Sequence, residues 1–279
     1  MKTINLLKIE LCKVKHHRLS KILLIAYFIL LTSIALIASI NFTLGHKKIS
    51  LAEQGIFNFP YIWHFNTYIA DFFTFFLAII IVAMVTNEYS YRTLKQNLID
   101  GLSKKEFILS KFYFIVALAL IATLLVFVIS IILGFVYSDY TSSGLVFSQM
   151  YFLFAFFLKI LGMFSLILFA GILLKRSAFA LGFIFIWIIF EKIIYAILRW
   201  ELFDKEIAYK VSAFFPYTSI QNLLPEPWSR LSAVKQVSKQ IGENIDKFDG
   251  IGIMPFLIVM AWIIVLNYLS FRILERRDL

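Results

Sequence analysis

Six long apolar runs divide this chain and limit what it can fold into. They lie at residues 22–40, 68–85, 107–137, 146–174, 178–198 and 253–271. A helix needs about 20 mostly apolar residues to cross the hydrocarbon core of a bilayer. Only 16% of the residues are charged, whereas a soluble domain carries about a quarter. The sequence therefore predicts an all-α polytopic membrane protein with six transmembrane helices in a single domain, residues 1–279.

Two polar segments stand out, one at the N-terminus and one before the last apolar run. Residues 1–21 are strongly basic, and their apolar positions recur at helical spacing. Those positions are Ile4, Leu7, Leu11 and Val14. The pattern predicts an N-terminal amphipathic helix lying on the membrane surface. Residues 199–252 form the largest polar region and precede the last apolar run.

The basic residues predict the orientation of the chain in the membrane. Of the 27 Lys and Arg, 16 lie in residues 1–21, 87–111, 175–176 and 272–279, and 9 lie in the longer connections on the other side. Because cytosolic segments carry the excess of Lys and Arg, both termini are expected in the cytosol. Residues 199–252 are then extracytoplasmic. The protein itself is expected in the cell (inner or cytoplasmic) membrane. This orientation also accounts for the net charge of +10, so no nucleic-acid partner is expected.

The polar insert at residues 86–112, between the second and third spans, has the most local structure. Its apolar positions fall on one helical stripe, formed by Tyr91, Leu94, Leu98 and Leu102. Gly101 is placed to end that helix in a left-handed conformation. Ser103 and Glu106 then have the spacing of a capping box that opens the next helix. The pattern predicts a short cytosolic helix within residues 91–103; an ordinary solvated loop is the alternative.

Two charged residues, Lys159 and Glu191, lie inside apolar runs, where a charge usually marks an ion pair or a transport pathway. The fourth and fifth spans form a hairpin, and both residues lie about 20 Å from its turn at a rise of 1.5 Å per residue. We therefore predict a buried Lys159–Glu191 salt bridge within the membrane; a role on a substrate path is the alternative. Asp71, near the start of the second span, is expected at the outer membrane interface.

Several kinds of chemistry have no sequence support. No G-x-x-x-x-G-K-[ST] stretch is present, so the chain has no nucleotide cradle of its own. The four histidines are His16, His17, His46 and His64, and they divide between the two sides of the membrane. No metal site is expected from them, and the single Cys12 excludes an intramolecular disulfide. The chain is not expected to be an enzyme or to bind a cofactor.

One set of residues resembles a known family. The sequence reads Glu-Tyr-Ser-Tyr-Arg-Thr-Leu from Glu88 to Leu94, then Gly-Leu-Ser-Lys-Lys-Glu from Gly101 to Glu106, followed by Lys111. With the six apolar runs, this resembles the permease subunits of ABC-2-type ABC transporters over essentially the whole chain. The family pattern is E-x-x-x-G/R-T-l, a short helix, and s-R-x-x-x-l-x-x-K. Lys104 stands where the family more often has Arg, which keeps the charge and loses bidentate geometry. The residues from Arg276 to Leu279 are also similar to family tails.

The resemblance implies a transport function that depends on partners. ATP and Mg²⁺ would be bound by a separate ABC ATPase, expected in two copies. A second permease copy would form a homodimer or heterodimer with the path between the copies, and export is the expected direction. The short cytosolic helix would couple the ATPase to the spans, through Glu88, Tyr91, Arg92, Thr93, Leu94, Lys95, Leu98, Ser103 and Lys104. Within that set, the apolar side chains would anchor in an ATPase groove and the basic ones would pair with acidic residues at its rim.

The resemblance also gives the outer region an expected form. The stretches Phe214–Tyr217 and Leu223–Pro225 are similar to short re-entrant helices that cover the path in the family. Two other functions are compatible with the residues alone. One is an ion-coupled secondary transporter that uses Lys159 and Glu191, and the other is a non-transporting membrane scaffold.

Overall fold

The computed structural model of the chain describes residues 3–38, 41–44, 47–50, 55–230 and 250–277. The described elements, in order, are α1 (Thr3–His16), α2 (Arg18–Ala38), β1 (Asn41–Leu44), β2 (Lys47–Ser50), α3 (Tyr61–Ser90), α4 (Thr93–Ile99), α5 (Lys104–Tyr137), α6 (Ser143–Val146), α7 (Tyr151–Leu174), α8 (Ser177–Ile197), a π-helical turn (Leu198–Leu202), α9 (Lys205–Ser212), α10 (Pro216–Gln221), a 3-10 turn (Trp228–Arg230) and α12 (Ile253–Glu275). Strands β1 and β2 form a small antiparallel hairpin. The predicted all-α membrane fold is confirmed, with this hairpin as its one departure among the described residues.

Among the described residues, five helical segments are long and apolar enough to cross a membrane: α3, α5, α6 with α7, α8 with the π-helical turn, and α12. The number becomes six if the bent pair of α1 and α2 counts as one span. Helix α3 begins at Tyr61, well before the predicted start of the second span at residue 68. Parts of several predicted segments lie outside the described residues, namely positions 1–2, 39–40, 45–46, 51–54, 231–249 and 278–279.

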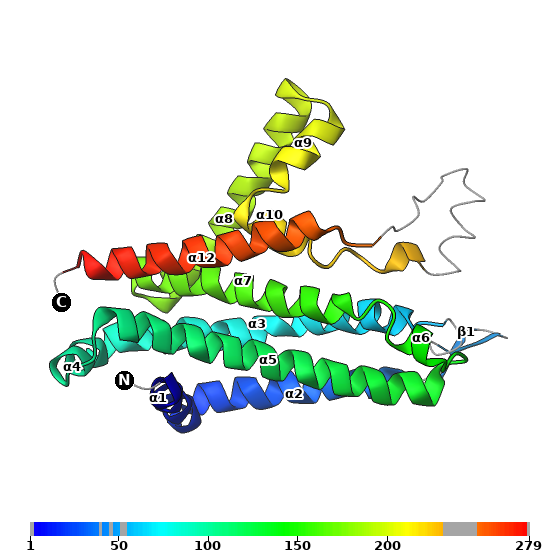
Figure 1. Cartoon of the computed structure of the whole chain (residues 1–279), viewed down its shortest axis with the longest axis horizontal. Coiled ribbons are helices and arrows are strands. Elements are labelled where there is room, and N and C mark those ends of the chain that lie inside the picture. The colour runs from blue at the N-terminus through cyan, green and yellow to red at the C-terminus, as the bar shows by residue number, and fades with distance from the viewer. Residues whose placement is uncertain (1–2, 39–40, 45–46, 51–54, 231–249, 278–279) are drawn as a thin grey trace.

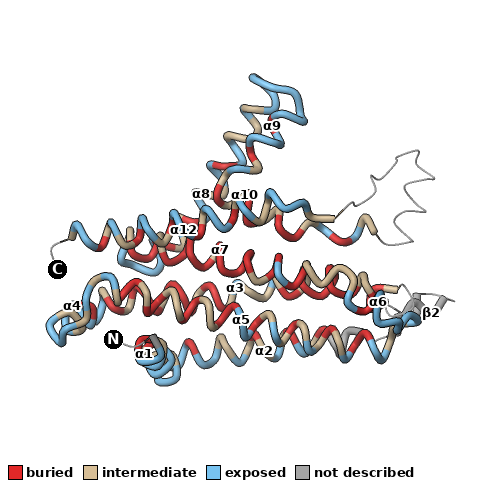
Figure 2. The backbone as a smooth tube through the Cα atoms, viewed as in Figure 1, coloured by how far each residue is buried: buried red, intermediate tan, exposed pale blue. Residues whose placement is uncertain are grey.

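Helix α7 forms the centre of the bundle. It packs against α3, α5, α8 and α12, and Figure 2 shows long buried stretches along α7 and α3. Three phenylalanines of α7 are completely buried: Phe152, Phe156 and Phe164. Helix α8 leans away from the bundle (Figure 1), and most of its side chains are exposed. A helix that is apolar all round but exposed in a monomer has surface available for lipid or another protein chain.

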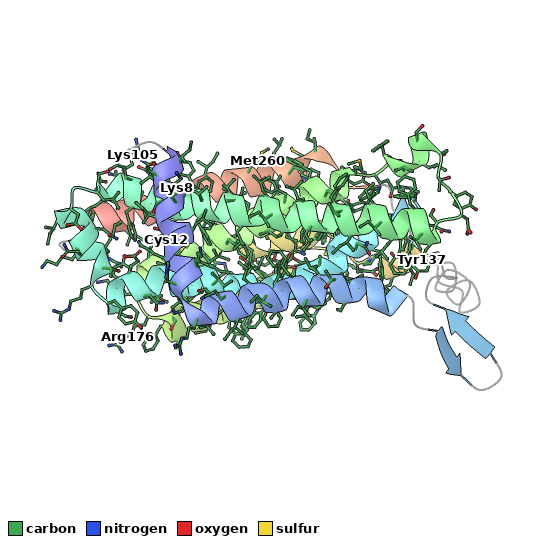
Figure 3. The ribbon with its side chains drawn as sticks, turned by 90° about the horizontal axis from the view of Figure 1, so that it is seen from below. Lys8, Cys12, Lys105, Tyr137, Arg176 and Met260 are labelled. Atoms are coloured by element: carbon green, nitrogen blue, oxygen red, sulfur yellow. The ribbon has the colours of Figure 1, made fainter. Side chains whose placement is uncertain are left out.

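Helix α1 lies across the end of the bundle, at 91° to α2 (Figure 3). The predicted apolar stripe of α1 is only half right. Leu7 and Val14 pack against the core, but Ile4 and Leu11 are exposed. Side chains one position away from the predicted stripe, Leu6 and Glu10, face the bundle and are buried. The buried face of α1 is therefore rotated from the predicted stripe, so that it includes Glu10, the one acidic residue of segment 1–21.

The two ends of the bundle carry different elements. Helices α1 and α4 and the two chain termini lie at one end, whereas α6 and the β1–β2 hairpin lie at the other (Figure 1). The helices thus place the basic segments 1–21, 87–111 and 272–277 together, as the predicted orientation requires.

Gly134 is required by a close contact between α5 and the segment before α3. A Cβ atom at Gly134 would overlap the ring of Phe59. That ring is held by two further aromatic neighbours, Trp63 at 5.8 Å and Phe135 at 5.7 Å between centroids. Because the ring is buried and in contact with two other aromatic rings, it has little freedom to move away.

We expect Gly134→Ala to lower the free energy of unfolding by about 1–3 kcal/mol, the usual cost of overpacking a core. Thermal unfolding of the detergent-solubilised protein measures it. The matched control is Gly182→Ala in α8, where a Cβ meets no atom within 4 Å and alanine favours the helix. Equal melting temperatures for the two variants would show that the Phe59 contact is not tight.

Candidate functional site

The segment around α4 has defined ends. Arg92 precedes the helix in a left-handed conformation, with φ 56°, and Gly101 follows it with φ 96°. The amide of Gly101 donates to the Leu98 carbonyl and the amide of Leu102 donates to the Asn97 carbonyl, which is the Schellman pattern. The predicted Gly101 cap is confirmed. Helix α4 is shorter than the predicted range 91–103, because Arg92 and Gly101 have left-handed conformations and lie outside it.

The capping box that opens α5 is also confirmed. The Ser103 hydroxyl accepts a hydrogen bond from the Glu106 amide, and the Glu106 carboxylate accepts one from the Ser103 amide. Two amides of the first turn, which have no partner within the helix, are satisfied in this way. The turn between α4 and α5 is therefore fixed on both sides.

The apolar face of α4 differs from the prediction. Leu94 is 2% exposed and belongs to the core of the bundle, and Leu98 is half-buried against it. Leu94 packs inside its own chain, which contradicts the prediction that it anchors in a partner's groove; for the half-buried Leu98 this stays a prediction. The exposed apolar side chains are Tyr91 and Ile99, at 72% and 70%. Arg92 and Lys95 are exposed beside them, as expected.

Glu88, at the end of α3, holds α4 in place. Its Oε2 atom accepts hydrogen bonds from Thr93 Oγ1 at 2.6 Å and Asn97 Nδ2 at 3.3 Å. The two donors lie one turn apart on α4, so both the position and the rotation of the helix are set by one carboxylate. Glu88 is itself buried. Its carboxylate therefore forms its hydrogen bonds and ion pairs within the permease.

The other oxygen of Glu88 belongs to a buried cluster of four charges. Lys111 Nζ lies 2.7 Å from Glu88 Oε1 and 2.6 Å from Glu10 Oε2. Lys13 Nζ contacts both carboxylates from the more exposed side, and Ser110 Oγ donates to Glu10 at 3.2 Å. Two positive and two negative charges make the cluster formally neutral. Buried charges are stable only when they are paired and hydrogen-bonded in this manner.

The cluster joins α1, α3 and α5, and through Glu88 it reaches α4. Lys111 was noted in the sequence only as part of the family pattern, and the contributions of Glu10 and Lys13 were missed. Two signals were available. Glu10 is the only acid in the basic segment 1–21, and Lys13 follows it at the i,i+3 spacing that brings helical side chains together.

The C-terminal segment is tied to the same end of the bundle. Lys104 Nζ donates to the carbonyls of Glu275 and Arg277, at 3.0 and 2.8 Å. The Arg277 guanidinium donates to the carbonyls of Ile172 and Leu173 at the end of α7. Three of these carbonyls, those of Ile172, Leu173 and Glu275, lie at helix ends, where they have no partner within the helix. Lys104 is thus placed as a link to the tail, and the α4–α5 turn is connected to α12 and α7.

A cleft lies beside the exposed Tyr91. It has a volume of about 310 Å³ and lies between α1, the end of α3 and the start of α4. Its wall includes Val14, His17, Met84 and Thr93. Its position next to Tyr91 extends the exposed face of α4 toward α1.

The charges within the spans pair differently from the prediction. Lys159 Nζ lies 2.9 Å from Asp71 Oδ2 on α3. Glu191 instead accepts hydrogen bonds from Trp187 Nε1, at 2.7 Å, and from the amides of Tyr217 and Thr218, at 2.9 and 2.8 Å. The predicted Lys159–Glu191 salt bridge is therefore wrong, and Asp71, which was expected only at the outer interface, is the partner of Lys159.

The physical reason is the extent of α3 and the position of α10. Because α3 begins at Tyr61, Asp71 lies about 15 Å along the helix, at the depth of Lys159. Glu191 caps the first turn of α10, where free amides and the helix dipole favour a carboxylate. Lys159 Nζ also approaches the Gln221 carbonyl at the other end of α10, at 3.5 Å. Both buried charges thus hold α10 against the bundle.

Comparison with known proteins identifies the family of the chain. A family model described as "ABC-2 family transporter protein" matches residues 5–279. No curated protein sequence matches the chain. The match covers essentially the whole chain, and the chain belongs to the ABC-2 family. It is a multi-pass membrane subunit of an ABC transporter.

We expect Lys111→Met to lower the free energy of unfolding by about 3–5 kcal/mol, because it leaves Glu10 and Glu88 buried with only Lys13 to share. The double variant Glu10→Gln with Lys111→Met should recover part of that loss, since the remaining Glu88–Lys13 pair is again neutral. Denaturant unfolding in detergent measures both. Lys210→Met, which removes the exposed Lys210–Glu206 pair, is the control and should cost less than about 1 kcal/mol. A double variant as unstable as the sum of its single variants would contradict the cluster.

A double-mutant cycle distinguishes the two possible partners of Lys159. Asp71→Asn and Lys159→Met should show a coupling free energy of about 0.5–3 kcal/mol, as contacting residues do. The cycle of Lys159→Met with Glu191→Gln should show a smaller coupling, because these side chains share no contact and are linked only through α10. Stability measured by thermal unfolding gives both values. A larger coupling for Lys159 and Glu191 would restore the original pairing.

Proposed function

We propose that this ABC-2 family subunit is an exporter permease that docks on a separate ABC ATPase through α4. The observation that carries the proposal is the placement of α4: Lys95 and Ile99 on the helix, and Tyr91 and Arg92 just before it, are exposed, while Glu88 and Leu94 fix its inner side. Two apolar side chains flanked by two cations suit a groove with an apolar floor and an acidic rim. ATP and Mg²⁺ are bound by the partner and not by this chain.

Force from the partner would enter a rigid junction. A push on α4 acts on α3 through Glu88 and on α1 and α5 through Lys111. Lys104 and Arg277 extend the junction to α12 and α7. Packed elements with discrete contacts transmit such displacements as rigid-body shifts. Closure of the ATPases on ATP would then be converted into reorientation of the spans.

The remaining parts of the proposal concern orientation and assembly. The charge distribution supports cytosolic termini and a cytosolic α4, in the cell (inner or cytoplasmic) membrane. We propose two permease copies, as a homodimer or heterodimer, with two ATPases and the path between the copies. The exposed apolar surface of α8 and the exposed Phe72 and Phe75 of α3 are available for that contact. Helix α10, held by Glu191, would cover the path at its outer side.

Affinity purification tests the docking surface. The double variant Tyr91→Asp with Ile99→Asp should reduce the ABC ATPase recovered with the permease at least tenfold, because buried hot-spot contacts contribute 2 kcal/mol or more. Its melting temperature should not change, since both side chains are exposed. The conservative double variant Tyr91→Phe with Ile99→Leu should retain the ATPase. Leu94→Asp should instead destabilise the permease itself, because Leu94 is buried in the bundle.

Two results would count against the proposal. Full recovery of the ATPase with the double aspartate variant would place the docking surface elsewhere. Transport in liposomes driven by an ion gradient, without ATP or a partner, would favour a secondary transporter.

A further inference from the structure

An apolar groove runs between α5 and α12 on the outside of the bundle. Its volume is about 300 Å³. Its walls are Ile108, Leu109 and Phe112 on α5, and Ile263, Ile264 and Phe271 on α12. Both helices are long and apolar enough to span the membrane, so an unfilled apolar groove here faces lipid.

The groove has the depth of one leaflet. Ile263 and Phe271 are eight positions apart, or about 12 Å along α12. Half of the hydrocarbon core of a bilayer is about 15 Å thick. Helix α5 begins, and α12 ends, at the end of the molecule that carries α4 (Figure 1). The groove therefore lies in the leaflet on that side, which is the cytosolic leaflet in the proposed orientation.

A single cation lines the groove, at its α4 end. Lys105 belongs to the first turn of α5 and is exposed. Its ammonium makes no hydrogen bond or ion pair with the described residues, whereas neighbouring Lys104 donates to two carbonyls of the tail. Among the described residues, the only other polar side chain in the wall is Asn267, whose Nδ2 atom donates to Ser165 Oγ at 3.0 Å and the Ile263 carbonyl at 2.7 Å. Both of its N–H groups are thus used within the protein.

We propose that this groove is a binding site for an anionic phospholipid of that leaflet, with one acyl chain between α5 and α12 and the phosphate group at Lys105. The groove by itself would not select a lipid, because the bilayer is as apolar as its walls. Selectivity comes from the charge at its end, since a lysine near the surface attracts anionic lipids. Only the name of the leaflet rests on the proposed function; the site itself requires only that α5 and α12 span the membrane.

Photolabelling tests the site on the permease alone. The protein is placed in nanodiscs of phosphatidylcholine that contain either phosphatidylglycerol or phosphatidylcholine with a diazirine in the acyl chain. After illumination, mass spectrometry measures the labelled fraction of the peptides that contain residues 108–112 and 263–271. We expect phosphatidylglycerol to label these peptides more strongly. Lys105→Gln should reduce its labelling about fivefold, the change that one lysine near the surface produces, and Lys105→Arg should preserve it.

The controls separate this site from general basic attraction and from loss of the fold. Lys8→Gln removes an exposed cation at the same end of the molecule (Figure 3) that does not line the groove, and it should leave labelling unchanged. Leu109→Trp fills the groove and should abolish labelling, whereas Leu124→Trp, at an exposed position of α5, should not. Each variant is compared by its melting temperature.

Three results would overturn the proposal. They are equal labelling by the two lipids, equal loss in Lys8→Gln and Lys105→Gln, and a disulfide across two copies of Ile264→Cys that closes the groove. None of them depends on whether the ATPase binds, so the two proposals fail separately.

Discussion

The pairing of Lys111 with two carboxylates is the interaction on which the α4 end of the bundle depends. Lys111 is completely buried, and a desolvated ammonium is tolerated only with good partners. Glu10 and Glu88 supply them from α1 and α3. Since a well-packed apolar core would be as stable as such a cluster, stability alone does not explain it. The charges also specify how α1, α3 and α5 are arranged, because each carboxylate can pair with Lys111 in one arrangement of these helices.

A second layer of charge lies deeper in the membrane, and α3 carries a member of each layer. Glu88 and Asp71 are 17 positions apart on one unbroken helix, or about 26 Å. Asp71 holds Lys159 of the central α7, and Lys159 approaches the end of α10. A displacement of α4 that moves α3 along its axis would therefore reach α10 without any flexible segment between them. In the proposed transporter, this connects the ATPase surface with the outer side of the path.

The sequence was sufficient where a local rule decides the structure, and insufficient where contacts between distant segments decide it. The Gly101 cap and the Ser103–Glu106 box follow from residue types at fixed spacing, and both were predicted. The partner of Lys159 was not, because the predicted second span began seven residues late and left Asp71 at the interface. The depth argument compared only the two helices of a hairpin, while the true partner lies on α3. Choosing between equally deep partners requires the packing order of the helices, which periodicity does not contain.

The same limit explains why the predicted partner of the apolar stripe of α4 differs from the observed one. An apolar stripe indicates that a helix packs against something, but not whether that surface belongs to its own chain. Helix α4 has seven residues, too few to form alone in water. It therefore needs contacts within the permease, and Leu94 and the Glu88 hydrogen bonds provide them. Since Leu94 is used in this way, a partner in the proposed complex would contact the exposed residues around it: Tyr91, Arg92, Lys95 and Ile99. In the proposed complex, the contacts that this short helix needs within the permease thus limit which of its residues are available for docking.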